Sequence, residues 1–100
     1  MSYNLILTSM AHRDLSQALK YYAKISPVLS ERFLQHTKAA FTDLETHPHF
    51  YSYFGDGKRL RNHTIKKFPY TIVFEIKLTE VFVVGIYNMH QNRDVGLNRL

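Results

Sequence analysis

Apolar and polar residues follow one another along this chain in blocks that predict one strand, two helices and then three strands. From Tyr3 to Thr8 the two kinds alternate with a period of two, which is typical of a short β-strand. The next two blocks repeat apolar residues at helical spacing. Strand patterns then cover Arg61 to Lys67, Tyr70 to Lys77 and Val81 to Tyr87.

The two helical blocks are separated by Ser26-Pro27. Thr8 or Ser9 can cap the first helix, because a hydroxyl accepts from free backbone N–H groups. A residue before proline avoids helical angles, so the first helix is predicted to stop at Ser26, and Ser26 with Pro27 can start the second. The second helix is predicted to end near His47-Pro48. The apolar stripes are Ala11, Leu15, Ala18, Leu19, Tyr22 and Ile25 in the first helix and Leu29, Phe33, Ala40, Phe41 and Leu44 in the second.

The last three blocks predict the rest of a sheet. Tyr70, Ile72, Phe74 and Ile76 share one face of their strand, whereas the final strand is apolar on both faces, as expected of a covered central strand. Between helices and strands, residues 47–57 read as a packed surface loop. The order β-α-α-β-β-β predicts a single α+β domain over residues 1–100, with a helical hairpin packed on a mostly antiparallel four-stranded sheet.

Charge is unevenly distributed along the chain. Residues 1–50 carry five Lys/Arg against four Asp/Glu, a balance of +1, and residues 51–100 carry eight against four, a balance of +4. Five of these cations lie between Lys58 and Lys67 with no carboxylate among them. We expect them to point outward from a rigid sheet toward an acidic partner or a polyanion. The alternative is a solvated basic face that serves solubility.

Composition excludes several other classes of function. The chain has no cysteine, so disulfides and thiolate chemistry are excluded, which is consistent with a reducing cytosol. The start has no secretory signal pattern and no apolar run reaches the ~20 residues of a membrane span, so we expect a cytoplasmic protein. His47-Pro48-His49 lacks carboxylates or cysteines at ligand spacing, and no phosphate-cradling loop is present. The sequence therefore indicates neither a metal nor a cofactor.

Motifs in both halves of the chain resemble the RelE/ParE superfamily of toxins from bacterial toxin–antitoxin pairs. The resemblance extends from Tyr3 to Arg93, and its most specific part is Phe68-Pro69-Tyr70 with the strand that follows, Thr71 to Ile76. The other matching positions are Ala11, Asp14-Leu15, Ala18, Tyr21-Tyr22, Arg32-Phe33, the proline after the second helix, Gly57 and Arg61. The superfamily implies the same order of elements as the pattern of apolar residues.

The resemblance implies a partner and leaves two targets open. Its members are neutralised by an antitoxin, usually encoded alongside, which fills apolar surface between helices and sheet; the basic charge here favours an acidic antitoxin and a toxin–antitoxin hetero-oligomer. ParE-like members inhibit DNA gyrase by protein contact, and RelE-like members cut messenger RNA on the ribosome. The Phe68-Pro69-Tyr70 turn is closer to the ParE-like branch. A third hypothesis is a degenerate member that only binds its antitoxin.

The strand end departs from the ParE-like pattern. Such sequences often place a histidine just after the last strand and a basic residue three positions later. Here these positions hold Asn88 and Gln91, while His90 and Arg93 lie two residues further on. The roles of the family's strand-end residues are therefore not assigned to Asn88 and Gln91.

Cleavage of RNA without a metal needs proton transfer and cations for the phosphorane. The candidates for proton transfer are Tyr87 and His90. The candidates for phosphate or target binding are Arg59, Arg61, Lys66 and Arg93. Each has a structural alternative: Tyr87 as a core residue, His90 as an exposed loop residue, and Arg61 in an ion pair with Glu75. The resemblance thus leaves open a gyrase inhibitor without enzymatic activity, a metal-independent endoribonuclease and the degenerate member that only binds its antitoxin.

Overall fold

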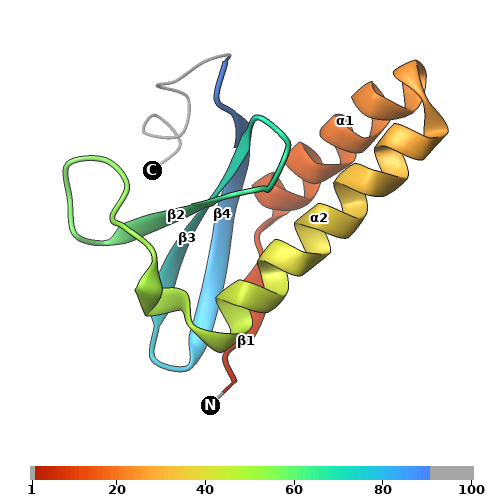
Figure 1. Cartoon of the computed structure of the whole chain (residues 1–100). Helices are drawn as coiled ribbons and strands as arrows, with labels where there is room; N and C mark the ends of the chain where they lie inside the picture. Colours follow the sequence, from red (N-terminus) through yellow and green to blue (C-terminus); the bar gives the residue numbers. More distant parts are fainter. Residues whose placement is uncertain (1, 91–100) are drawn as a thin grey trace.

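The computed structural model describes residues 2–90, and its elements follow the predicted order. They are β1 (Asn4–Leu7), α1 (Ser9–Ile25), α2 (Pro27–Thr46), the short 3₁₀ helix η1 (Pro48–Phe50), β2 (Leu60–Thr64), β3 (Tyr70–Lys77) and β4 (Glu80–Asn88). Figure 1 shows the helical hairpin of α1 and α2 lying along one side of the sheet. The predicted α+β architecture is confirmed.

The four strands form one sheet in the order β1-β4-β3-β2. β1 runs parallel to β4, whereas the β2–β3 and β3–β4 pairs are antiparallel, so the sheet is mostly antiparallel as predicted. β4 lies between β1 and β3, so it is a central strand, as predicted. Leu78 and Thr79 connect β3 to β4, and Leu78 has a positive φ of 55° in this tight turn.

Both helices begin at the predicted caps. The hydroxyl of Thr8 accepts a hydrogen bond from the backbone N–H of Ala11 over 3.2 Å and donates one to the carbonyl of Val83 over 3.0 Å. One side chain therefore starts α1 and joins it to β4. Ser26 accepts from the N–H of Leu29, and Pro27 is the first residue of α2. These caps satisfy N–H groups that a helix leaves without intrahelical partners.

An aromatic cluster joins the helices to the corner between β2 and β3. The ring of Tyr22 lies 5.1 Å from that of Phe33 and 5.2 Å from that of Phe68, centroid to centroid. The ring of Phe33 lies 5.0 Å from Phe68 and 5.1 Å from Tyr70. Tilted and edge-on aromatic pairs at this separation are stabilising. The Phe-Pro-Tyr segment at residues 68–70 is therefore part of the core, because both its rings pack on the helices.

A bulge in β4 changes which residues of that strand face the helices. Val73 pairs with Gly85 and Phe74 pairs with Val83, so Val84 is left out of the pairing with β3. Before the bulge, Val83 packs in the core beneath the helices; after it, Ile86 does so. Without the extra residue, strict alternation would have placed residues 85 and 87 in the core instead.

The structure corrects the predicted ends of the strands and the predicted burial of Ile25. β2 ends at Thr64, not at Lys67, because Ile65 is fully buried and the chain turns there, with the N–H of Phe68 donating to the carbonyl of Ile65. Lys67 has a φ of 68°, as the third residue of a turn can have. The pattern predicts Ile25 on the apolar stripe of α1, yet it is 60% exposed, because this end of the hairpin projects past the sheet (Figure 1). β1 is also shorter than predicted by one residue at each end.

Within residues 2–90, neither helix combines the length and the apolar character needed to cross a bilayer.

Candidate functional site

The predicted site residues are divided between the two faces of the sheet. Arg61 pairs with Phe74 in the β2–β3 register, so the two side chains share the face that carries the helices. Tyr87 pairs with Thr71 and therefore lies on the second face, away from the helices. Since a strand presents successive side chains to opposite faces, no rotamer change brings Arg61 and Tyr87 to one reaction centre.

Arg61 is held by its own chain. Its Nη1 donates to the backbone carbonyl of Tyr51 over 2.6 Å and to that of His49 over 3.2 Å. Its Nη2 donates to the hydroxyl of Tyr53 over 3.1 Å, and the guanidinium lies 4.2 Å from the centre of that ring. These contacts fasten the segment after η1 to the edge strand β2. The guanidinium acts as a structural clamp, which corrects the expectation that it points outward.

Arg59 forms the ion pair that the sequence suggested for Arg61. Its Nη1 lies 2.9 Å from Oε1 of Glu75, whose side chain is largely buried. Lys77 lies 3.9 Å from the same oxygen and 5.7 Å from the centre of the Phe82 ring. The carboxylate of Glu75 thus neutralises part of the positive charge on the second face.

Tyr87 lies over Gly85 on the second face. A Cβ atom at residue 85 would overlap the ring and hydroxyl of Tyr87, so only glycine leaves room for this placement. The side chain of Tyr87 is half-buried. Its position is set by packing against the backbone of its own strand.

The remaining predicted residues lie away from this pair. Lys66 is exposed in the turn before β3, at the corner of the sheet. His90 is exposed just beyond β4, where its N–H donates to the Asn88 side chain over 2.9 Å. Arg93 lies outside the described residues. Of the six candidates, the structure places Arg59 and Tyr87 on one face, Arg61 on the other and Lys66 and His90 beyond the strand ends.

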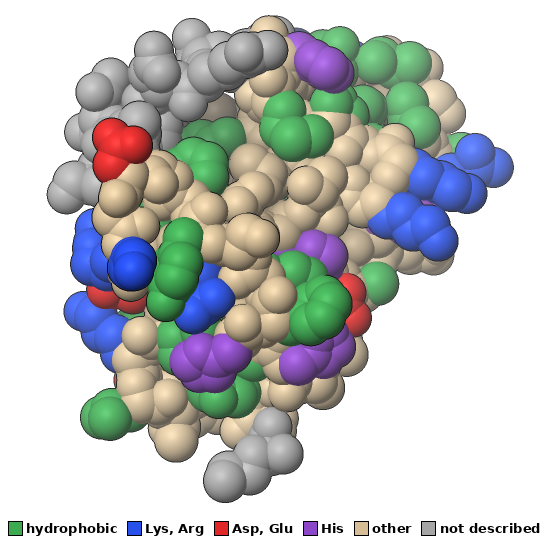
Figure 2. Space-filling model, turned by 60° about the vertical axis from the view of Figure 1, so that its left-hand side comes forward, with side chains coloured by type: hydrophobic (Ala, Val, Ile, Leu, Met, Phe, Trp, Pro, Cys, Tyr) green, Lys and Arg blue, Asp and Glu red, His purple; other side chains and the backbone are tan. Residues whose placement is uncertain are grey.

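Figure 2 shows the face of the molecule that carries β2 and the loop before it. Lys and Arg side chains gather in separate groups toward the two edges of this view, and histidines and exposed hydrophobic side chains lie between them. The positive charge on this face is therefore divided between separate groups.

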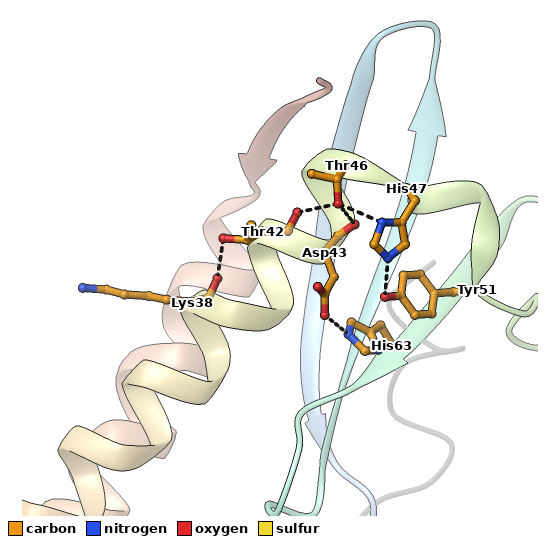
Figure 3. A network of polar contacts seen from close by, with 7 residues as sticks. All are labelled: Lys38, Thr42, Asp43, Thr46, His47, Tyr51 and His63. Atoms are coloured by element: carbon orange, nitrogen blue, oxygen red, sulfur yellow. Dashed lines mark hydrogen bonds and ion pairs between the residues drawn. The ribbon is translucent and has the colours of Figure 1, made fainter. Parts of the chain in front are cut away.

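Sequence reasoning missed a network of polar side chains between α2 and β2 (Figure 3). Nε2 of His63 lies 3.1 Å from Oδ2 of Asp43, and an ionised carboxylate can only accept, so the imidazole donates. The ring of His63 stacks on that of Tyr51 with centroids 4.1 Å apart. The hydroxyl of Tyr51 lies 3.3 Å from Nε2 of His47. Asp43 and His63 are twenty residues apart in sequence, so only the fold reveals this pair.

Each ring nitrogen of His47 lies near a hydroxyl group. The hydroxyl of Thr46 lies 3.1 Å from the carbonyls of Thr42 and Asp43. Its oxygen also lies 2.8 Å from Nδ1 of His47. The hydroxyl of Tyr51 lies at Nε2, on the other side of the ring. Thr42 and Thr46 lie four residues apart, as do His47 and Tyr51. This spacing is the local signal from which their contacts could have been predicted.

The electrostatic state of Tyr51 follows from its burial and from Asp43. Removal from water, with the nearby Asp43 carboxylate as the smaller cause, raises the pKa of the Tyr51 phenol above 10.0. Phe50, Tyr51, Ser52, Asn62, His63 and Thr64 line a hollow of about 390 Å³ beside it. Both causes thus favour the neutral phenol over the phenolate.

The network has the geometry of a clamp and not that of a general base. In a working His–Asp pair the carboxylate is buried and the imidazole meets the substrate. Here the His63 side chain is 19% exposed and that of Asp43 is 45% exposed, which is the reverse arrangement. The network ties α2 to the edge strand β2. Among residues 2–90, no three His, Asp or Glu side chains converge as metal ligands.

Comparison with known proteins gives two matches. Residues 5–94 match a family model described as the ParE toxin of type II toxin-antitoxin systems, parDE. A solved structure described as a chromosomal ParDE toxin–antitoxin system from P. aeruginosa superposes with a TM-score of 0.76 at 19% sequence identity. That alignment covers 87% of this chain and 96% of the other, and at this identity the likeness concerns the fold. No curated protein sequence matches.

Proposed function

Because the chain belongs to the ParE toxin family of type II toxin–antitoxin systems, we propose that it arrests growth by inhibiting DNA gyrase through protein contact. It acts in the cytoplasm as one domain over residues 1–100, and a cognate antitoxin encoded alongside neutralises it in a hetero-oligomer. The observation that carries this proposal is the family match, which spans almost the whole chain.

The division of the candidate residues supports inhibition by contact over cleavage of RNA. Stabilising the phosphorane requires cations that are free to approach it and that lie next to the groups that transfer protons. Arg61 donates to the chain's own carbonyls, and Arg59 is paired with Glu75. Tyr87 and Arg61 lie on opposite faces of the sheet. A protein-contact inhibitor needs no such convergence, because it acts through shape and charge.

The exposed lysines are the residues we expect to meet gyrase. Lys58 lies in the loop before β2, and Lys66 lies in the turn after it, both exposed. Arg59 and Arg61 have structural roles, so these lysines are the better choices for changing target binding without changing the fold.

An assay of supercoiling by purified gyrase tests the proposal directly. We expect micromolar toxin to inhibit supercoiling, and we expect the protein encoded in the adjacent reading frame to restore it. Primer extension on translated messages from arrested cells is the companion measurement, and the messages should be intact. Full supercoiling activity in the presence of toxin, or toxin-dependent cuts in messages, contradicts the proposal.

A further inference from the structure

The outer edge of β2 is open over its last residues. Backbone groups of successive residues in an antiparallel strand point to opposite edges of that strand. The N–H of Ile65 donates to the carbonyl of Tyr70 in β3, so the backbone groups of the residue before it, Thr64, face outward. Those of Asn62 do so too, and its N–H donates to the carbonyl of Ser52. Within residues 2–90, the C=O of Asn62 and the N–H and C=O of Thr64 have no backbone partner on this edge.

A short segment before β2 covers only the first half of this edge. Tyr53 forms an antiparallel bridge with Arg61, and the N–H of Phe54 donates to the carbonyl of Leu60. On the other side of Ser52 the chain comes from η1, and a hollow of about 390 Å³ lies beside the end of the strand. An uncovered strand edge is a template on which another chain can pair.

The hollow beside the open edge can take a side chain from a paired strand. Two of its lining residues, Tyr51 and His63, have stacked rings, and Phe50 is 79% exposed. Successive side chains of a strand point to opposite faces, so a strand added next to Thr64 directs alternate side chains toward one face. The exposed ring of Phe50 offers such a side chain an apolar contact.

Exposed cations flank the open edge. Lys58 lies two residues before β2, and Lys66 and Lys67 follow it by two and three residues. Figure 2 shows Lys and Arg side chains in groups toward both edges of the face that carries β2. Asp56 is the only acid between residues 52 and 67, and the other edge strand, β1, has no charged residue. An acidic strand is therefore attracted to the edge of β2.

We propose that an extended acidic segment of gyrase adds as a strand to the open edge of β2, at Asn62 and Thr64. The proposal rests on the proposed function, in which Lys58 and Lys66 are the expected target contacts. The three open backbone groups pair with the added strand, one of its side chains fills the hollow, and its carboxylates meet the flanking lysines.

Other occupants fit this edge less well. Two copies of the chain could pair only around Thr64, because the rest of the edge is covered, and this brings Lys66 and Lys67 of both copies together. A nucleic acid has no regular row of N–H and C=O groups to pair with the strand. The resemblance implies that the antitoxin fills apolar surface between helices and sheet, which leaves this edge to the target.

Thr64→Pro tests the pairing directly. The proline ring replaces an N–H that faces away from β3, so the pairing of β2 with β3 is kept. The toxin concentration for half-inhibition of gyrase should rise about tenfold, because the added strand loses a hydrogen bond and meets the ring. Thr64→Ala keeps the N–H and should raise that concentration clearly less. Thermal unfolding of each variant, and its binding to the purified protein encoded in the adjacent reading frame, check that it folds.

A second variant and a direct measurement do not depend on the proline. Phe50→Ala removes part of the wall of the hollow and should raise the half-inhibiting concentration about threefold, because the added side chain loses an apolar contact. Hydrogen exchange at the amide of Thr64 should slow at least about tenfold when the unmodified toxin binds gyrase. The amide of Asn62 is already bonded to Ser52 and should slow less.

The outcomes separate this proposal from the proposed function. If folded Thr64→Pro inhibits gyrase as well as the unmodified chain does, the strand addition is wrong and the proposed function stands. If Thr64→Pro does not fold, exchange at Thr64 decides, and an unchanged rate in the complex overturns the strand addition. If Thr64→Pro loses affinity for the neighbouring protein and not for gyrase, the edge belongs to the antitoxin and the proposal is again wrong. If the unmodified chain leaves supercoiling intact, both proposals fall.

Discussion

The carboxylate of Asp14 in α1 accepts a hydrogen bond from the backbone N–H of Ile86 in β4, with Oδ2 and N 3.0 Å apart. The pair joins the first helix to the central strand just after the bulge, where the strand's own ladder is disrupted. Asp14 is buried, so this N–H is satisfied without water. The side chain therefore has a structural role, which explains why an acid occurs on the inner face of an otherwise apolar stripe.

Asp14→Ala should lower the free energy of unfolding by about 1–3 kcal/mol, because a buried backbone N–H loses its acceptor. Asp14→Asn keeps a carbonyl oxygen in the same place and should cost less. Urea unfolding of the three proteins measures the difference. Equal stability of the alanine variant and the unmodified chain would show that the hydrogen bond contributes nothing.

Gly85→Ala should move the ring of Tyr87 away from its strand, since the new methyl group occupies the place of the ring. Overpacking of this kind costs roughly 1–3 kcal/mol, and less if the ring swings into solvent. In a Tyr87→Ala background the same substitution should cost less, because the collision is gone. A double-mutant cycle measures the coupling, and additive effects would contradict the packing described for this pair.

Arg61→Ala should loosen the segment after η1 and lower the free energy of unfolding by about 1–3 kcal/mol, because two carbonyls lose a charged donor. Arg61→Lys should rescue only part of this, since an ammonium lacks the planar fork that reaches both carbonyls and the Tyr53 ring. Hydrogen exchange should accelerate at the amide of Phe54, which donates to Leu60. Lys58→Ala is the control, and a matching effect there would contradict the clamp.

Stability should fall at alkaline pH because of Tyr22. Burial first, and then the phenols of Tyr70 and Tyr21, raise the pKa of Tyr22 above 10.0. A raised pKa in the folded state means that the stabilisation is complete below pH 10.0 and is lost as pH rises above it. Unfolding measured at pH 9 and about pH 11 should show less loss for Tyr22→Phe than for the unmodified chain. Tyr3→Phe should behave like the unmodified chain, and identical pH profiles for all three would contradict this assignment.

Lys58→Glu/Lys66→Glu should weaken inhibition of gyrase and leave the fold intact. Both side chains are exposed, so a change in stability within about 0.5 kcal/mol is expected. The toxin concentration for half-inhibition should rise about tenfold, because two attractive contacts become repulsive. Lys38→Glu, on α2, is the control, and unchanged inhibition by the double variant would mean that the target contacts another surface.

The features that the sequence predicted correctly depend on neighbours within a few residues. Thr8 caps α1 through the N–H of Ala11, and Ser26-Pro27 separates the helices, so local stereochemistry was enough. The partners of Arg61 and His63 lie eight to twenty residues away and depend on how the loop after α2 folds back. The charge of the segment predicted that both arginines point outward. In the structure Arg61 donates to backbone carbonyls of its own chain, and Arg59 pairs with the largely buried Glu75.

The bulge in β4 is the feature that alternation could not predict. A run such as Val81 to Tyr87 is apolar on both sides, so a change of face within it leaves no trace in the hydrophobic pattern. The position of Tyr87 on the second face therefore required the strand pairing.

Val84 consequently acts as a spacer between two segments of β4 that are out of phase with each other. Deletion of this single residue would move every later side chain of β4 to the opposite face of the sheet. The phenol of Tyr87 would then face the helices, and Ile86 would face away from them. Gain or loss of one residue in this strand thus changes which of the later side chains its end presents on each face, although those side chains stay the same.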